Sequence, residues 1–119
     1  GPVLMLNLLR FRAVADYEGD PDLTPDQPIS GAEAFDLYVD LTLPLLRAKG
    51  GELTMMATGG PYLIGPSEEV WDRVMLVRQP SVAAFMDWAQ DETYLAGIGH
   101  RSAALQDARL LPLSELPHG

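Results

Sequence analysis

Residues 70–77 show the most informative alternation of side chains in the sequence. One set of alternate positions combines three apolar residues with Asp72, and the other combines three apolar residues with Arg73. A strand without a polar face is typical of a sheet that is covered on both sides. The pattern therefore predicts a central strand here.

The apolar run of residues 3–11 predicts a second strand of the same kind. Asn7 is the exception on one of its two faces. A buried amide of this kind is either satisfied by a neighbouring backbone group or serves as a polar contact in a pocket. The sequence leaves both interpretations open.

Two longer segments repeat apolar residues at helical spacing. Ser30 and Glu33 form a capping box at the start of the first helix, which ends at the Gly50-Gly51 pair and should kink at Pro44. Ser81 caps the second segment. Asp91 is a second N-cap within this segment. We therefore expect two helical pieces that meet at a bend near Asp91, the second of which continues to Leu105.

The remaining segments predict shorter strands and irregular chain. Residues 52–58 form a strand that bends at 59–61 and resumes at 62–64. Residues 109–113 form a last strand, and Pro112 places it at a sheet edge or lies at the end of the strand. Residues 12–29 hold five acidic residues and three prolines without a period. Such a long loop is a lid or is disordered, and its acids favour a solvated loop over a calcium site.

The order strand, helix, strand, strand, helix, strand is the ferredoxin-like order, βαββαβ. It predicts an α+β fold in which two helices cover one face of a four-stranded antiparallel sheet, as one domain over residues 3–113 with a flexible tail at 114–119. Two strands lack a polar face, so the other side of the sheet also needs a cover. We expect a second copy to supply it, as a homodimer in which two sheets pack face to face.

The composition of the chain limits the classes of partner that it can bind. Eight basic residues against seventeen acidic ones give a net charge of −9, which disfavours nucleic acid and anionic membranes as partners. The absence of cysteine excludes thiol nucleophiles, thiolate metal sites and disulfides. No apolar run is long enough to cross a bilayer and no secretory segment opens the chain, so we expect a cytoplasmic protein.

Several blocks of sequence resemble a known family. They are LNLLRF at residues 6–11, SGAEAF at 30–35, WDRV at 71–74 with VRQPS at 77–81, and HRSAALQDARL at 100–110. The chain resembles a bacterial family of dimeric α/β-barrel proteins catalogued as a domain of unknown function. The resemblance implies a ferredoxin-like protomer paired into a barrel, and it implies no assigned activity.

The wider superfamily of that family includes cofactor-independent monooxygenases, lactone isomerases, polyketide cyclases and haem enzymes, which enter only as analogy. Two features depart from the family pattern. Gln79 stands where an aromatic residue is usual, and the loop after Arg12 is long and rich in proline. Both adjoin the expected cavity, which points to a ligand particular to this chain.

The central strand also supplies candidate binding residues. If Val74 and Leu76 face the helices, then Trp71, Arg73 and Met75 face the cavity on the other side of the sheet. Met5 and Asn7 join them if their face is the same one. An aromatic wall, a guanidinium and an amide suit a planar, partly anionic molecule. Trp71 and Arg73 are equally typical of a dimer interface.

His100 is the main candidate for a proton carrier near neutral pH, since His118 lies in the tail. Its position on the helix favours exposure over a place at the cavity rim, and haem ligation through it is a further alternative. No metal site is expected, because no second histidine stands at helical spacing. Tyr38 lies on the buried stripe of the first helix. Two ion pairs are also expected, Arg101 with Asp72 and Arg109 with Asp107.

These features favour a dimeric enzyme that acts on an aromatic or enolic metabolite in the barrel cavity. The reaction is proton transfer, cyclisation or oxygenation without a bound cofactor. Arg73 is expected to stabilise the negative charge that develops on the substrate, and Asn7 to orient the group that carries this charge. His100 or Tyr38 is expected to move the proton. The alternatives are a non-catalytic small-molecule binding protein and a structural dimer whose cavity is filled by Trp71, Met75 and Met5.

Overall fold

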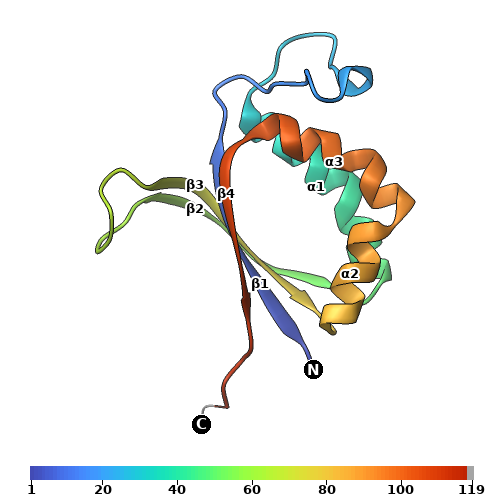
Figure 1. Ribbon diagram of the computed structural model, residues 1–119, viewed down its shortest axis with the longest axis vertical. Helices are drawn as coiled ribbons and strands as arrows, with labels where there is room; N and C mark the ends of the chain where they lie inside the picture. Colours follow the sequence, from blue (N-terminus) through green and yellow to red (C-terminus); the bar gives the residue numbers. More distant parts are fainter. Residues whose placement is uncertain (118–119) are drawn as a thin grey trace.

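The computed structural model describes residues 1–117 as one layer of strands packed on one layer of helices (Figure 1). His118, part of the predicted tail, lies outside the described residues. The elements in chain order are β1 (Val3–Phe11), a short 3₁₀ turn η1 (Pro21–Leu23), α1 (Gly31–Ala48), β2 (Glu52–Pro61), β3 (Val70–Gln79), α2 (Val82–Gln90), α3 (Glu92–Ala104) and β4 (Leu105–Leu113).

The four strands form one antiparallel sheet in the order β2-β3-β1-β4. All three α-helices lie on the same side of it (Figure 1). The predicted ferredoxin-like α+β fold is therefore confirmed. The two strands without a polar face, β1 and β3, occupy the interior of the sheet, and β4 with Pro112 lies at an edge, also as predicted.

Local sequence signals determine where the helices begin. Ser30 accepts a hydrogen bond from the backbone N–H of Glu33 at 3.0 Å, and the Glu33 carboxylate accepts one from the backbone N–H of Ser30 at 3.0 Å. This pair is the predicted capping box. Asp91 ends α2 and caps α3 by accepting from the backbone N–H of Thr93 at 2.8 Å, which confirms the break between two helical pieces.

Two predicted boundaries are wrong. The helix ends at Ala104 and β4 begins at Leu105, four positions before the predicted strand, because Leu105 already pairs with Phe11 across the sheet. Strand β2 continues through 59–61 to Pro61, its register shift lies between Leu53 and Met55 and not at the glycines, and 62–64 lies outside the strand. Gly59 permits this pairing, since a Cβ there would clash with the backbone carbonyl of Trp71.

The predicted orientation of β3 is also wrong. Asn7 pairs with Met75 and Met5 pairs with Val77, which places these four residues on one face of the sheet. That face carries the helices, because Met75 belongs to the core with Tyr38 of α1 and Tyr94 of α3. Both alternating sets in β3 are largely apolar, so the sequence pattern did not distinguish the two faces.

The core lies between this face and the helices. Phe35 is fully buried there and packs against Tyr38 with the rings tilted and their centroids 5.2 Å apart. Leu9 of β1 is also fully buried beneath α1 and α3. The described members of this core are Leu9, Tyr17, Ala34, Phe35, Tyr38, Met75, Tyr94, Ala103 and Ala104.

The opposite face of the sheet is largely apolar and no element of the described residues covers it, and we call it the outer face. Register places Leu6, Leu76, Met55 and Leu111 side by side there, with Leu111 55% exposed. Its apolar members are Leu4, Leu6, Leu8, Met55, Ala57, Val74, Leu76, Leu111 and Leu113. None of the described helices, residues 1–117, is long and apolar enough to span a bilayer.

The loop of residues 12–29 packs on the end of α3 and is not a detached segment. The backbone N–H of Arg12 donates to the carbonyl of Ala104 at 2.8 Å, and that of Asp16 donates to Ala103 at 2.9 Å. The side chain of Tyr17 is buried in the core. The loop is therefore an ordered cover over the N-terminal end of α1 and the C-terminal end of α3.

Replacing Phe35 with alanine should lower the free energy of unfolding by about 3–5 kcal/mol, because the substitution leaves a cavity in the core. Leu37→Ala on the same helix is the matched control, since Leu37 is 39% exposed and should cost about 0.5 kcal/mol. Urea unfolding followed by circular dichroism measures both variants. Equal losses for the two variants would contradict the described packing of α1.

Candidate functional site

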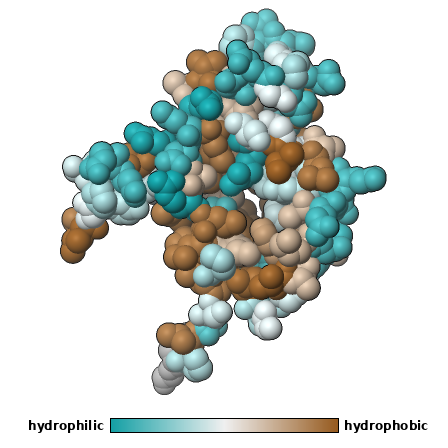
Figure 2. All heavy atoms as spheres, viewed as in Figure 1, coloured by the Kyte–Doolittle hydropathy of each residue, from teal (hydrophilic) through white to brown (hydrophobic). Residues whose placement is uncertain are grey.

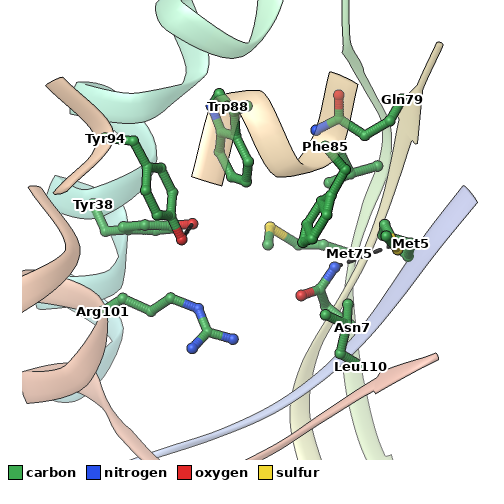
Figure 3. Close-up of a pocket in the computed structure, with 11 residues that line it drawn as sticks. Met5, Asn7, Tyr38, Met75, Gln79, Phe85, Trp88, Tyr94, Arg101 and Leu110 are labelled. Carbon is green, nitrogen blue, oxygen red and sulfur yellow. Dashed lines mark hydrogen bonds between the residues drawn. The ribbon is translucent and has the colours of Figure 1, made fainter. Parts of the chain in front are cut away.

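A cavity of about 200 Å³ lies between the sheet and the helices (Figure 3). It opens on the helix side of the sheet, whereas the sequence interpretation placed the cavity on the other side. This location follows from the orientation of β3 described above. The lining residues are Met5, Asn7, Tyr38, Met75, Val77, Gln79, Phe85, Trp88, Tyr94, Arg101 and Leu110.

The period of each element brings these side chains together. Met5 and Asn7 are two residues apart on β1, so both project from the face of the sheet that carries the helices. Tyr94 and Arg101 are seven residues apart on α3, which is close to two helical turns, so both project from one side of that helix. Figure 3 shows these groups converging on the space in front of Met75.

Two tyrosines form a hydrogen-bonded pair at the cavity wall. The hydroxyl of Tyr38 donates to the hydroxyl of Tyr94 at 3.1 Å, and both rings are buried. Burial raises the pKa of Tyr38, Tyr94 raises it further, and the positive charge of Arg101 acts in the opposite direction. Tyr38 therefore keeps its proton near neutral pH and acts as a hydrogen-bond donor to Tyr94.

Arg101 points its guanidinium into the cavity from α3 (Figure 3). Within residues 1–117 no carboxylate lies within ion-pair distance of it, whereas Arg73 pairs with Asp36 at 2.7 Å. The predicted pair with Asp72 is wrong, because Asp72 accepts from the backbone N–H of Phe11 at 2.8 Å. A cation that pairs with no carboxylate in the described part of the chain thus faces the cavity.

Asn7 lies on the floor of the cavity. Its side-chain N–H donates to the backbone carbonyl of Met5 at 3.1 Å, as the simpler interpretation predicted. Its amide oxygen faces the cavity (Figure 3), so the residue is also placed as a polar contact. Gln79 closes one end of the cavity and is fully buried, and within residues 1–117 its amide has no hydrogen-bond partner.

The cavity lining contains no carboxylate and no imidazole among the described residues. Its polar groups are two tyrosine hydroxyls, two amides, one indole and one guanidinium. All of these except the amide oxygens act mainly as hydrogen-bond donors near neutral pH. The site is therefore built to bind and stabilise negative charge and not to remove a proton from a weakly acidic group.

Three of the predicted site residues do not line this cavity. Arg73 contacts the ring of Phe11, with its guanidinium carbon 4.9 Å from the ring centroid, besides pairing with Asp36. Trp71 is buried at the base of the β2–β3 hairpin, where its indole N–H donates to the hydroxyl of Tyr62 at 2.9 Å. The third is His100, whereas Met5, Asn7, Tyr38 and Met75 do line it.

His100 is buried, which corrects the expectation that it is exposed. Its side chain is 9% exposed, and its Nδ1 lies 2.7 Å from the hydroxyl of Tyr17 in the loop of residues 12–29. An aperiodic loop gives no sequence signal of where it packs, so helical spacing alone did not show this cover. The haem alternative loses its geometric basis, since His100 does not open onto the cavity.

The loop and the histidine form a small polar cluster separate from the cavity. Burial lowers the pKa of His100, and the nearby carboxylate of Asp20 acts against that shift. Burial also raises the pKa of Tyr17. Within residues 1–117 no group of three histidine, aspartate or glutamate side chains is arranged to hold a metal ion.

Comparison with solved structures identifies one protein that is similar in both sequence and fold. The crystal structure of RPA0582, a protein of unknown function from Rhodopseudomonas palustris, has 37% sequence identity and a TM-score of 0.85 to this chain. The match covers 99% of this chain and 85% of that one. A scan against protein-family models and a search of the curated proteins found no match.

More distant structures share the fold. A dimeric ferredoxin-like protein of unknown function from Thermobifida fusca matches 96% of this chain and 91% of its own, with 14% identity and a TM-score of 0.54. A proposed antibiotic biosynthesis monooxygenase from Caulobacter crescentus matches 98% of this chain and 92% of its own, with 12% identity and a TM-score of 0.56. At these identities the likeness shows the ferredoxin-like fold alone.

The lowered pKa of His100 predicts a loss of stability on acidification. The unfolded chain has the ordinary histidine pKa of about 6.5, so between that value and the lower folded pKa the unfolded state binds more protons. The free energy of unfolding should therefore fall as the pH falls through this window. Urea unfolding at pH 7 and pH 5 measures the change.

In that experiment His100→Gln should remove the part of the pH dependence that His100 contributes. An NMR titration that assigns to His100 a pKa at or above 6.5 would contradict the described burial under the loop.

Proposed function

This chain belongs to the same family as RPA0582 of Rhodopseudomonas palustris, a protein of unknown function, and we propose that it is a homodimeric small-molecule enzyme. Its substrate is an aromatic or enolic metabolite that binds, as an anion, in the cavity between the sheet and the helices. The observation that carries the proposal is the guanidinium of Arg101, which faces an aromatic cavity and pairs with no carboxylate of residues 1–117.

Charge supports an anionic ligand. The chain has seventeen acidic residues, yet none of the described ones neutralises Arg101. A buried or half-buried cation without a partner is costly, and a carboxylate, phenolate or enolate oxygen can accept two of its N–H groups. The bound ligand would thus supply the missing negative charge.

Shape and composition support a small, planar ligand. Phe85, Trp88 and Tyr94 give the cavity aromatic walls, and Met5 and Met75 give it an adaptable apolar floor. The volume of about 200 Å³ lies below the range of about 300–1,000 Å³ typical of sites for drug-sized ligands. A molecule with one or two fused rings is the size class that this space suits.

The tyrosine pair supports proton transfer to that anion. Tyr38 donates to Tyr94, so the hydroxyl hydrogen of Tyr94 is free to donate to an oxygen or carbon of the ligand. When Tyr94 gives up its proton, Tyr38 keeps its own and stabilises the Tyr94 phenolate through the 3.1 Å hydrogen bond, until water returns to Tyr94 the proton that the ligand released. The proton donor in this proposal is therefore Tyr94, supported by Tyr38, and not His100.

The lack of a base in the lining limits the reaction class. Arg101 would lower the pKa of an enolic or phenolic ligand, which then loses its proton to water without help from a carboxylate. The bound anion can be protonated at another atom, which is an isomerisation, can cyclise, or can react directly with dioxygen. None of these reactions needs a bound cofactor in the present proposal.

The rival function is a small-molecule binding protein without turnover. The same lack of a carboxylate or imidazole in the described lining favours it, since many proton-transfer enzymes rely on such a base. The enzymatic function is supported by the structurally similar protein from Caulobacter crescentus, which is named as a monooxygenase. Turnover decides between the two functions.

The homodimer belongs to the proposal because of the outer face. Leu6, Leu76 and Leu111 lie together on a surface that no described element of the chain covers. Packing two such faces across a two-fold axis would bury both. The related fold from Thermobifida fusca is described as dimeric, which supports the same arrangement here.

The protein should lower the pKa of a small phenol that it binds. The probe is 4-nitrophenol, whose absorbance changes on ionisation, titrated with and without the protein. Arg101→Gln should weaken binding of the phenolate by about 2 kcal/mol, or about thirtyfold, because it removes charge-assisted hydrogen bonds.

Arg47→Gln, at an exposed position near the end of α1, is the matched control and should leave the shift intact. Arg73→Gln distinguishes the two interpretations of the site. Loss of the shift in Arg73→Gln but not in Arg101→Gln would restore the sequence-based assignment of Arg73.

Turnover should be visible with a planar 1,3-diketone in deuterated water. The enzyme proposal predicts that the protein accelerates deuterium uptake at the carbon between the two carbonyls as the enol form converts to the diketone, as measured by NMR. Tyr94→Phe should slow this uptake at least tenfold while the diketone still binds. Binding without acceleration by the wild-type protein would support the non-catalytic rival.

A further inference from the structure

The β2–β3 hairpin extends beyond the sheet as a separate ribbon. The pairing of β1 with β3 ends at Leu9 and Arg73, whereas β2 and β3 remain paired as far as Pro61 and Val70. We call residues 59–72 the arm. Figure 1 shows the arm projecting on the side of the sheet opposite the helices.

The tip of the arm carries two aliphatic residues that are almost fully exposed to solvent. Leu63 is 101% exposed and Ile64 is 92% exposed. Figure 2 shows apolar atoms at the far end of this projection. Single exposed aliphatic residues are common, but two in succession at the end of a projecting ribbon indicate a contact site.

The base of the arm is held in one arrangement. The indole N–H of Trp71 donates to the hydroxyl of Tyr62 at 2.9 Å, and that hydroxyl donates to the carboxylate of Glu69 at 2.8 Å. A two-stranded ribbon alone is barely stable, so these side-chain contacts account for its order. The tip is thus positioned in advance, which lowers the entropic cost of binding.

The base of the arm is also continuous with the outer face. Arg109 pairs with Leu8 in the sheet register and so shares the outer face with it. Its guanidinium carbon lies 5.1 Å from the centroid of the Trp71 ring, and it approaches Glu69 at 4.0 Å. The outer face and the arm therefore form one surface, with the arm as a wall at one side.

We propose that the arm clasps a second copy of this chain, so that Leu63 and Ile64 of each protomer become buried against its partner. This inference rests on the homodimer of the proposed function. A two-fold axis through the outer face makes the contact reciprocal, since each copy brings its own arm to the other. The net charge of −9 disfavours an anionic lipid surface as the occupant.

Photo-crosslinking from the tip tests which molecule the arm contacts. The chain has no cysteine, so Ile64→Cys supplies a single thiol for a photoreactive benzophenone label. Benzophenone-labelled protein of natural isotope content is mixed with ¹⁵N-enriched protein that carries no benzophenone. The mixture is illuminated and digested. We expect crosslinks between the labelled tip and ¹⁵N peptides.

Crosslinks confined to the labelled chain itself, or the absence of crosslinks in a sample that is dimeric by light scattering, would overturn the clasp. Crosslinks to lipid vesicles of phosphatidylcholine in place of the second copy would overturn it as well.

A charge substitution tests the contribution of the tip to dimerisation. Leu63→Asp combined with Ile64→Asp should raise the dimer dissociation constant at least tenfold, as measured by sedimentation over a dilution series. Val14→Asp is the matched control, because Val14 is 61% exposed on the loop of residues 12–29, away from the arm. An unchanged dissociation constant for the double variant overturns the clasp.

Failure of the clasp and failure of the homodimer give different results. If the wild-type protein sediments as a monomer at all concentrations, the homodimer itself is wrong. If the wild-type protein is dimeric and the double variant dimerises equally well, only the arm is wrong. Thermal melting of the double variant should match that of the wild-type monomer, since both positions are solvent-exposed in the isolated chain.

Discussion

The sheet of this protein has apolar side chains on both faces, and the chain provides helices for one of them. Burial of apolar surface is the largest favourable term in folding, so the uncovered face remains a source of free energy for association. This constraint comes from strands β1 and β3. Each of them has leucine or valine side chains on the outer face and core side chains on the face toward the helices. The proposed dimer and the position of the arm both depend on it.

The second constraint is electrostatic. Lys49, Arg73 and Arg109 each pair with a carboxylate of the chain. Arg101 instead faces a cavity whose polar groups are mainly donors. Such a site disfavours cations, including protonated amines. The positive electrostatic potential inside the cavity favours anions.

The sequence predicted those features that depend on neighbouring residues. The capping box of Ser30 and Glu33, the break at Asp91 and the order of elements are local signals, and the structure confirms them. The orientation of β3 was not predictable, because both of its alternating sets are apolar. That error moved the cavity to the wrong face and favoured Arg73 over Arg101. The burial of His100 under an aperiodic loop left no periodic signal either.

The cavity lining lies on the helix side of the sheet. In a dimer joined through the outer faces, two sheets would separate the two cavities. Each copy would then saturate at one equivalent of ligand with a simple hyperbolic isotherm. Association of the protomers and occupancy of the cavities would be thermodynamically independent unless the stacked sheets shift on binding.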